Sequence, residues 1–241
     1  MRHTLAMVYA LKHPEYLREV SSDGSETFGC DQRWYRTKWQ QMSGCGPTTA
    51  STILIYLQRS GRITLPVEVR ERHECIALME QVWQYVRPTA RGIYLAEQFC
   101  GGIQKFAKAH EFEIACEALS ICGNGKYGEE RNILRNLLLK PLQQPRTVAQ
   151  TDDLHTALEF IAAGLEQDTP IAFLNLASGE ARDVDEWHWM TIVELMYDQE
   201  TNRAEIRIID GSKTISMDFV TWFNTTSLGG SLVYLLPQAE P

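Results

Sequence analysis

One cysteine in this sequence has the setting of a catalytic nucleophile. Cys45 stands in the stretch Ser43-Gly-Cys-Gly-Pro-Thr-Thr, directly before a run whose apolar spacing predicts a helix over 47–60. The free N–H groups at the start of a helix stabilise negative charge, so this position favours the thiolate and could hold an oxyanion. Gly44 and Gly46 would leave room for a substrate backbone to approach the sulfur. We therefore interpret Cys45 as a candidate nucleophile for acyl transfer, with a buried core cysteine as the alternative.

The remaining cysteines lack this setting, and none of them forms a C-x-x-C pair. A chain of this size does not need a disulfide framework, so scattered cysteines of this kind are typical of small buried side chains in a reducing compartment. This pattern predicts a cytoplasmic protein. The cysteines expected to be structural are Cys30, Cys75, Cys100, Cys116 and Cys122.

One of the six histidines has the context of a general base. His188 stands in Asp185-Glu-Trp-His-Trp-Met, where an acidic loop enters a strand predicted over 189–196. A histidine at the mouth of a strand is held firmly and can still face a cleft. The others are expected to be solvated and are His3, His13, His73, His110 and His155.

A third member of the site follows from the predicted hairpin. The turn-like residues 198–202 separate the strand at 189–196 from a second strand at 204–209. Counting back from that turn places His188 opposite residues near 210–212. Asp210 lies there, and a carboxylate beside an imidazole fixes its tautomer and stabilises the imidazolium. The alternative is that Asp210 only begins an Asp-Gly turn.

Three short pieces of the sequence together resemble the papain-like superfamily of cysteine peptidases. They are Gly44-Cys45-Gly46-Pro47-Thr48 at a helix start, Trp187-His188-Trp189 in a strand and Ile209-Asp210 at the end of the next strand. Within the superfamily they are most similar to the bacteriocin-processing (double-glycine leader) peptidases, and the order Cys, His, Asp and the long Cys-to-His separation agree with papain-like enzymes. The resemblance implies a papain-like α+β fold, a thiolate–imidazolium pair and hydrolysis through an acyl-enzyme.

The sequence departs from this family at the oxyanion hole. The family usually places a glutamine six residues before the cysteine, where this sequence has Trp39. Gln40 and Gln41 lie five and four residues before Cys45, and Gln40 is the nearer fit. The resemblance thus implies Gln40 as the oxyanion donor, with Gln41 as the alternative. A further alternative is that both are only polar loop residues.

The predicted elements place helices first and an antiparallel sheet later, which is typical of the α+β class. Residues 14–44 are predicted to be irregular. The helix that opens with the nucleophile is expected to pack on the C-terminal sheet, in one domain over 1–241. Helices are predicted over 47–60, 73–86, 93–110, 129–140 and 152–166, and strands over 112–119, 171–176, 189–196, 204–209 and 231–236.

Composition restricts the partners. The 241 residues carry 23 basic and 31 acidic side chains, for a net charge of −8, without the basic footprint of a nucleic-acid binder. No apolar stretch is long enough to span a bilayer, and no signal peptide is expected at the start. No residue spacing predicts a metal or a cofactor site. Oligomeric state stays open.

These observations predict a cysteine hydrolase that cleaves a peptide or amide bond with a Cys45-His188-Asp210 triad. One alternative is an acyltransferase with the same triad. The other is a papain-like binding module that has lost catalysis.

Overall fold

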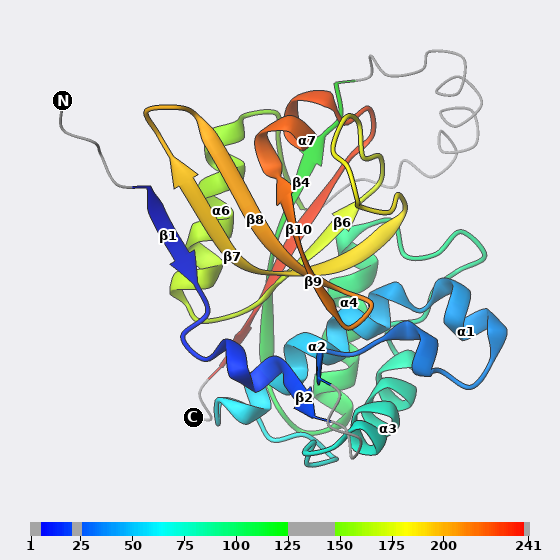
Figure 1. The fold of residues 1–241 in the computed structure, drawn as a ribbon. Helices are drawn as coiled ribbons and strands as arrows, with labels where there is room; N and C mark the ends of the chain where they lie inside the picture. The colour runs from blue at the N-terminus through cyan, green and yellow to red at the C-terminus, as the bar shows by residue number, and fades with distance from the viewer. Residues whose placement is uncertain (1–5, 21–25, 125–147, 239–241) are drawn as a thin grey trace.

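A computed structural model describes residues 6–20, 26–124 and 148–238 of the chain. A large sheet forms its centre, and the chain winds around it (Figure 1). Among the described residues the sheet contains eight strands: β1 (Met7–Ala10), β4 (Ile114–Cys122), β5 (Ala149–Thr151), β6 (Ile171–Asn175), β7 (His188–Asp198), β8 (Arg203–Asp210), β9 (Lys213–Asp218) and β10 (Gly229–Pro237).

The strands run in the order β5-β4-β10-β6-β7-β8-β9, and β1 pairs with the second half of β7. Strands β4 and β5 pair in parallel, whereas the other strand pairs in the described residues are antiparallel. The late strand β10 therefore lies inside the sheet, between β4 and β6.

Six α-helices and two short 3-10 helices surround the sheet in the described part of the chain. The α-helices are α1 (Lys38–Ser43), α2 (Cys45–Arg59), α3 (Arg72–Trp83), α4 (Ala96–Ala109), α6 (Leu154–Glu166) and α7 (Phe219–Thr225). The 3-10 helices are η1 (Pro14–Leu17) and η2 (Gln32–Trp34), and a separate hairpin joins β2 (Arg18–Val20) to β3 (Glu26–Phe28).

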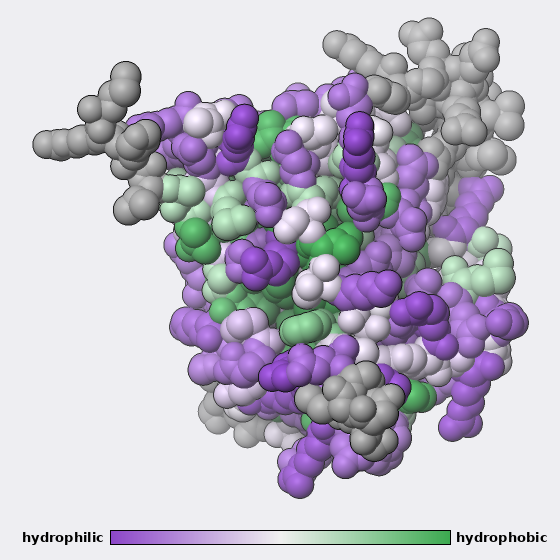
Figure 2. All heavy atoms as spheres, viewed as in Figure 1, coloured by the Kyte–Doolittle hydropathy of each residue, from purple (hydrophilic) through white to green (hydrophobic). Residues whose placement is uncertain are grey.

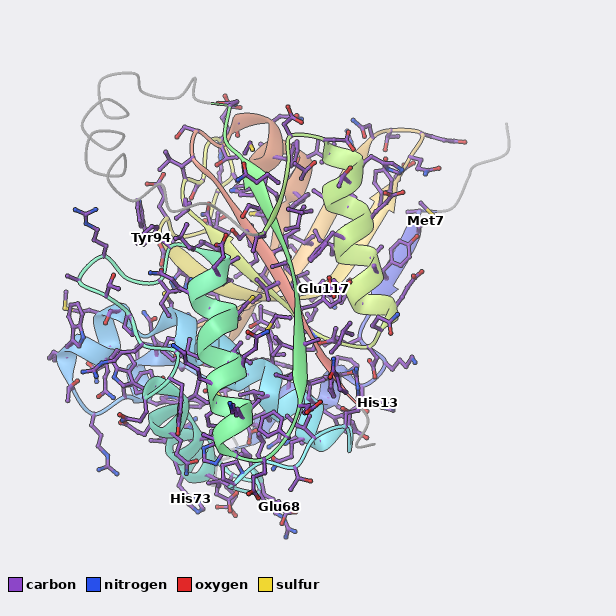
Figure 3. All side chains as sticks on the ribbon, turned by 180° about the vertical axis from the view of Figure 1, so that it is seen from behind. Met7, His13, Glu68, His73, Tyr94 and Glu117 are labelled. Carbon is purple, nitrogen blue, oxygen red and sulfur yellow. The ribbon has the colours of Figure 1, made fainter. Side chains whose placement is uncertain are left out.

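Both faces of the sheet are buried, because neighbouring residues of one strand join different apolar clusters. Ala172 and Leu174 pack with α2, α3 and α4, whereas Ile171 and Phe173 pack with α6 and α7. Figure 3, seen from behind, shows α4 and α6 on either side of the long strand β4, on which Glu117 is labelled. Packing on both faces holds the central strands in place, and these strands carry the candidate site.

The structure confirms the predicted α+β class, with α2 and its N-terminal cysteine packed on the sheet. The predicted helices over 47–60, 73–86, 93–110 and 152–166 correspond to α2, α3, α4 and α6. All five predicted strands are also present, as β4, β6, β7, β8 and β10. The predicted helix over 129–140 lies outside the described residues.

One structural prediction is wrong. The described parts of 14–44, which are residues 14–20 and 26–44, are not irregular throughout but contain η1, β2, β3, η2 and α1. Side-chain caps explain two of these elements: Asp31 accepts from the Arg33 N–H at the start of η2, and Thr37 forms a capping box with Gln40 at the start of α1. The glutamine predicted to lie on a loop is therefore on a helix.

The surface seen in Figure 2 is mostly hydrophilic, with hydrophobic residues visible in a hollow near its middle. Among the described helices, none has both the length and the apolar character needed to cross a bilayer. In the part of the chain that the structure describes, four large hydrophobic side chains are exposed, and they are Met7, Val8, Trp39 and Met42.

Candidate active site

The predicted nucleophile occupies the first position of a buried helix. Cys45 begins α2 directly after Gly44, which is both the C-cap residue of α1 and the N-cap residue of α2. From Gly46 to Leu57 every residue of α2 is buried, while Cys45 is only partly buried. The Thr48 N–H donates to the Gly44 carbonyl and Pro47 has no N–H, so the N–H groups of Cys45 and Gly46 are the ones at the helix start that can stabilise an anion at the sulfur or next to it.

The two glycines beside Cys45 allow close packing around the start of α2. A Cβ on Gly44 would meet the backbone oxygen of Gln40 and would lie 2.7 Å from Cε2 of Tyr35. A Cβ on Gly46 would lie 2.8 Å from Cδ1 of Ile93. Gly44 thus allows α1 to turn directly into α2, and this junction sets the direction of the sulfur.

His188 and Asp210 are brought together at one end of the β7–β8 hairpin. Nε2 of His188 lies 2.7 Å from Oδ1 of Asp210, and the two side chains are 13% and 24% exposed. Thr191 pairs with Ile209, as the hairpin count predicts. A β-bulge after Ile192 changes the register by one residue in the part of the hairpin between Ile192 and the turn.

The imidazole of His188 also interacts with Cys45. Burial alone would lower the pKa of His188, but hydrogen bonds to Asp210 and to Cys45 outweigh burial and raise the pKa to about 10. Because Nε2 is occupied by Asp210, Nδ1 is the ring nitrogen left for the sulfur. The arrangement therefore favours an imidazolium held between the Asp210 carboxylate and the Cys45 sulfur.

Buried contacts on both sides of His188 hold it in place. The neighbouring Trp189 donates from Nε1 to the Ile93 carbonyl at 2.7 Å and stacks on Phe99 of α4, with ring centroids 4.3 Å apart. On the other side, the fully buried Asn175 pairs with His188 across β6 and β7, and its Nδ2 donates to the Asp185 carbonyl at 2.8 Å. Asn175 therefore positions the loop that leads into His188, a role that its place in an apolar strand did not reveal.

Cys45, His188 and Asp210 line a common pocket of about 330 Å³. Gln32 of η2 also lines it, and the side-chain oxygen of Gln32 is buried without a hydrogen-bond partner among the described residues. A buried polar atom that lacks a partner usually has a ligand or water to meet. A half turn of the amide would present its N–H₂ group to the same space. Sequence reasoning missed Gln32 because it lies thirteen residues before Cys45 in the chain.

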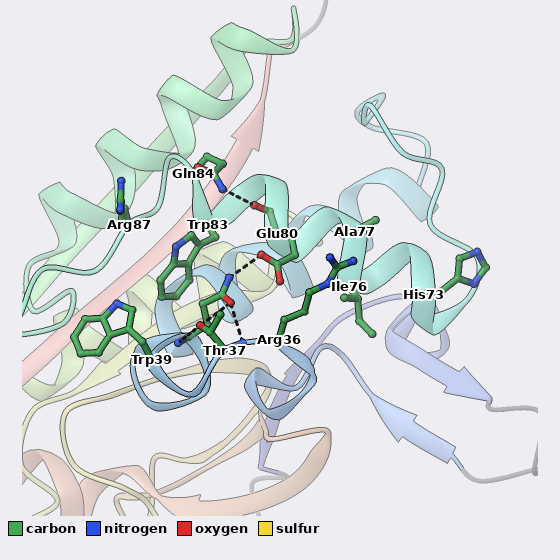
Figure 4. Close-up of a pocket in the computed structure, with 11 residues that line it drawn as sticks. Arg36, Thr37, Trp39, His73, Ile76, Ala77, Glu80, Trp83, Gln84 and Arg87 are labelled. Carbon is green, nitrogen blue, oxygen red and sulfur yellow. Dashed lines mark hydrogen bonds between the residues drawn. The ribbon is translucent and has the colours of Figure 1, made fainter.

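The structure places Gln40 elsewhere, which argues against its predicted oxyanion role. Its side-chain oxygen accepts from the Thr37 backbone at 3.2 Å, and its Nε2 donates to Glu80 Oε2 at 2.7 Å. These contacts lie in a different pocket, between α1 and α3, where Thr37 and Glu80 are labelled in Figure 4. The alternative, Gln41, donates to the Arg33 and Tyr35 carbonyls. Neither amide is directed to the Cys45 pocket.

No family model and no curated protein matches this sequence. The fold is similar to the crystal structure of UfSP from C. elegans, a cysteine protease with a papain-like fold, at a TM-score of 0.50 and 10% sequence identity. The match covers all of this chain and 36% of the UfSP chain, so the chain spans about a third of the length of that protein. The likeness shows a papain-like fold.

Proposed function

We propose that this protein is a cysteine hydrolase of papain-like type that cleaves a peptide or amide bond through a thioacyl-enzyme. The observation that carries the proposal is His188, which bonds Asp210 and Cys45 beside the start of a buried helix. The fold shared with UfSP, a cysteine protease, supports the same class. The narrower resemblance to bacteriocin-processing peptidases rests on the short motifs alone.

In the first half of the proposed reaction, the Cys45 thiolate attacks the carbonyl carbon and the carbonyl π electrons move to oxygen. The N–H groups at the start of α2 stabilise the resulting oxyanion. When the oxyanion collapses, the C–N bond breaks and the amine leaves with the proton of the His188 imidazolium. A thioester on Cys45 remains.

In the second half, neutral His188 takes a proton from water while the water oxygen bonds to the thioester carbon. Collapse of this second oxyanion breaks the C–S bond, which restores the thiolate and the imidazolium and releases the acid. Asp210 keeps the imidazole oriented throughout. An amine in place of water would give acyl transfer by the same steps, and product analysis with added amine distinguishes the two reactions.

Alkylation by iodoacetamide tests the proposal without a known substrate. An ordinary thiol is only slightly ionised at neutral pH, so Cys45 paired with an imidazolium should react roughly tenfold faster or more. Mass mapping of the modified peptides measures the rates, with Cys122 as the control because it is the exposed thiol among those described. His188→Ala should remove the advantage of Cys45. Equal rates at Cys45 and Cys122 in the wild type would contradict the proposal.

Gln32 is the proposed oxyanion donor in place of Gln40. Gln32→Ala should lower turnover by roughly 10²-fold, the effect typical of removing one such donor. Gln40→Ala should leave turnover per folded molecule nearly unchanged, but it should lower stability by about 1 kcal/mol because the capping box is lost. Turnover and thermal unfolding are measured on the same samples. A large loss of turnover in Gln40→Ala at wild-type stability would return the role to Gln40.

A further inference from the structure

The carboxylate that orients His188 stands at the edge of a tight turn with an unfavourable backbone. Asp210 pairs with Lys213, so only Gly211 and Ser212 connect β8 to β9. Both have positive φ, at 52° and 66°, as in a two-residue type I′ turn. Serine has no intrinsic preference for this left-handed conformation. The turn therefore depends on contacts from outside the hairpin.

Those contacts come from a segment far away in the sequence. Nη2 of Arg33 donates to the Gly211 carbonyl at 3.0 Å, and the Ser212 hydroxyl donates to Oδ2 of Asp31 at 3.1 Å. The Phe28 N–H donates to the Ser212 carbonyl at 3.1 Å. Three bonds thus attach the turn to residues 28–33.

Asp31 and Arg33 form one rigid unit. Nε of Arg33 donates to both carboxylate oxygens of Asp31, at 3.0 and 2.9 Å, and Nη2 bonds Oδ2 as well. The Arg33 backbone N–H donates to the same carboxylate at 2.8 Å. Asp31 is only 2% exposed although the Arg33 side chain is 66% exposed, so the buried carboxylate anchors a guanidinium at the surface. Burial would raise the pKa of Asp31, yet the bonds from Arg33 outweigh burial and lower it.

We propose that Asp31 and Arg33 are positioning residues that hold the 210–213 turn, and through it the Asp210 carboxylate, against His188. This inference rests on the proposed function and deepens it. Both residues would act through Asp210, so neither needs to touch a substrate. A displacement of Asp210 by about 1 Å would break the 2.7 Å bond to Nε2, and a misplacement of that size can cost on the order of 10²-fold in rate.

The titration of His188 reports this role, because the bond to Asp210 helps to raise its pKa. If Arg33 positions Asp210, Arg33→Ala loosens that bond and the pKa of His188 falls towards its ordinary value. If Arg33 acts only through its positive charge, its removal raises the pKa of His188 instead. The two effects have opposite signs. The other titratable or charged groups that line the same pocket are Cys30, Asp31, Cys45, Asp185, Asp210 and Lys213.

The experiment combines an NMR titration of the His188 ring with the rate of Cys45 alkylation by iodoacetamide at neutral pH. In Arg33→Ala we expect a lower pKa for His188 and alkylation that is roughly tenfold slower. Arg33→Lys keeps the charge but loses the planar fork, so both changes should be intermediate. The matched control is Arg207→Ala, which removes the 3.1 Å ion pair with Glu194 on the β7–β8 hairpin. It should change neither the pKa of His188 nor the alkylation rate of Cys45.

Thermal unfolding of each variant separates positioning from loss of the fold, and if Arg33→Ala does not fold, Arg33→Lys carries the test. An unchanged or raised pKa of His188 in the folded variants would overturn the positioning role. This outcome differs from failure of the proposed function, in which wild-type Cys45 reacts no faster than Cys122.

Discussion

Cys45→Ala is expected to abolish the proposed hydrolysis and leave the fold intact. Cys45 is the thiol that interacts with His188 in this pocket, so turnover should fall on the order of 10⁵-fold or more. The cost in stability should stay below about 1 kcal/mol, because the side chain is only partly buried and alanine suits a helix. The measurement is turnover of a cleavable amide together with thermal unfolding.

Two other cysteines provide controls for this substitution. Cys122→Ala removes an exposed thiol and should keep full activity. Cys30→Ala removes a buried thiol that lines the same pocket as Cys45, so it should lower stability more than turnover. A Cys45→Ala enzyme that retains activity, or a Cys30→Ala enzyme that loses all of it while folded, would mean that the sulfur of Cys45 is not the nucleophile.

His188→Ala should cost on the order of 10⁴-fold, since the thiolate loses its counter-ion and the leaving amine loses its proton donor. Asp210 should matter less, because it orients the base without replacing it. Asparagine can keep a hydrogen bond to the ring, so Asp210→Asn should retain more turnover than Asp210→Ala. Turnover per folded molecule across the three variants gives the order. Wild-type turnover in folded Asp210→Ala would remove Asp210 from the triad.

The same histidine predicts two pH dependences. Since the pKa of His188 is raised from 6.5 to about 10, wild-type activity should fall only as the pH rises through about 10. The stability that His188 contributes should likewise be complete below about pH 6.5 and be lost through about pH 10. In Asp210→Ala both changes should occur at lower pH. A pH–rate profile and thermal unfolding across that range test this directly.

The local parts of the structure could be predicted well from sequence. Cys45 precedes residues whose apolar side chains recur at helical spacing, and this spacing predicts α2. Residues 198–202 have the composition of a turn, and this turn sets the pairing of β7 with β8. Asp210 does not lie directly across from His188 but diagonally, which is still within reach for an imidazole.

The proposed oxyanion donor, Gln32, could not be predicted because its position depends on contacts distant in sequence. Gln32 lines the pocket because its two neighbours, Asp31 and Arg33, bond the turn at Gly211 and Ser212. No local pattern contains that information. Gln40 is different, since Thr37 three residues before it is the signature of a capping box, and that signature already assigns its amide to the helix start.

The central position of β10 has a consequence for synthesis of the chain. Cys45 is translated before β10, but β6, which supports His188, pairs on one side with residues 230–234 of β10. The sheet that brings the sulfur, the imidazole and the carboxylate together thus needs β10, which follows all three residues along the chain, and its non-local pairing predicts slow folding. A ribosome-bound chain that lacks β10 would then carry an unassembled site, so the proposed activity should appear only after β10 docks.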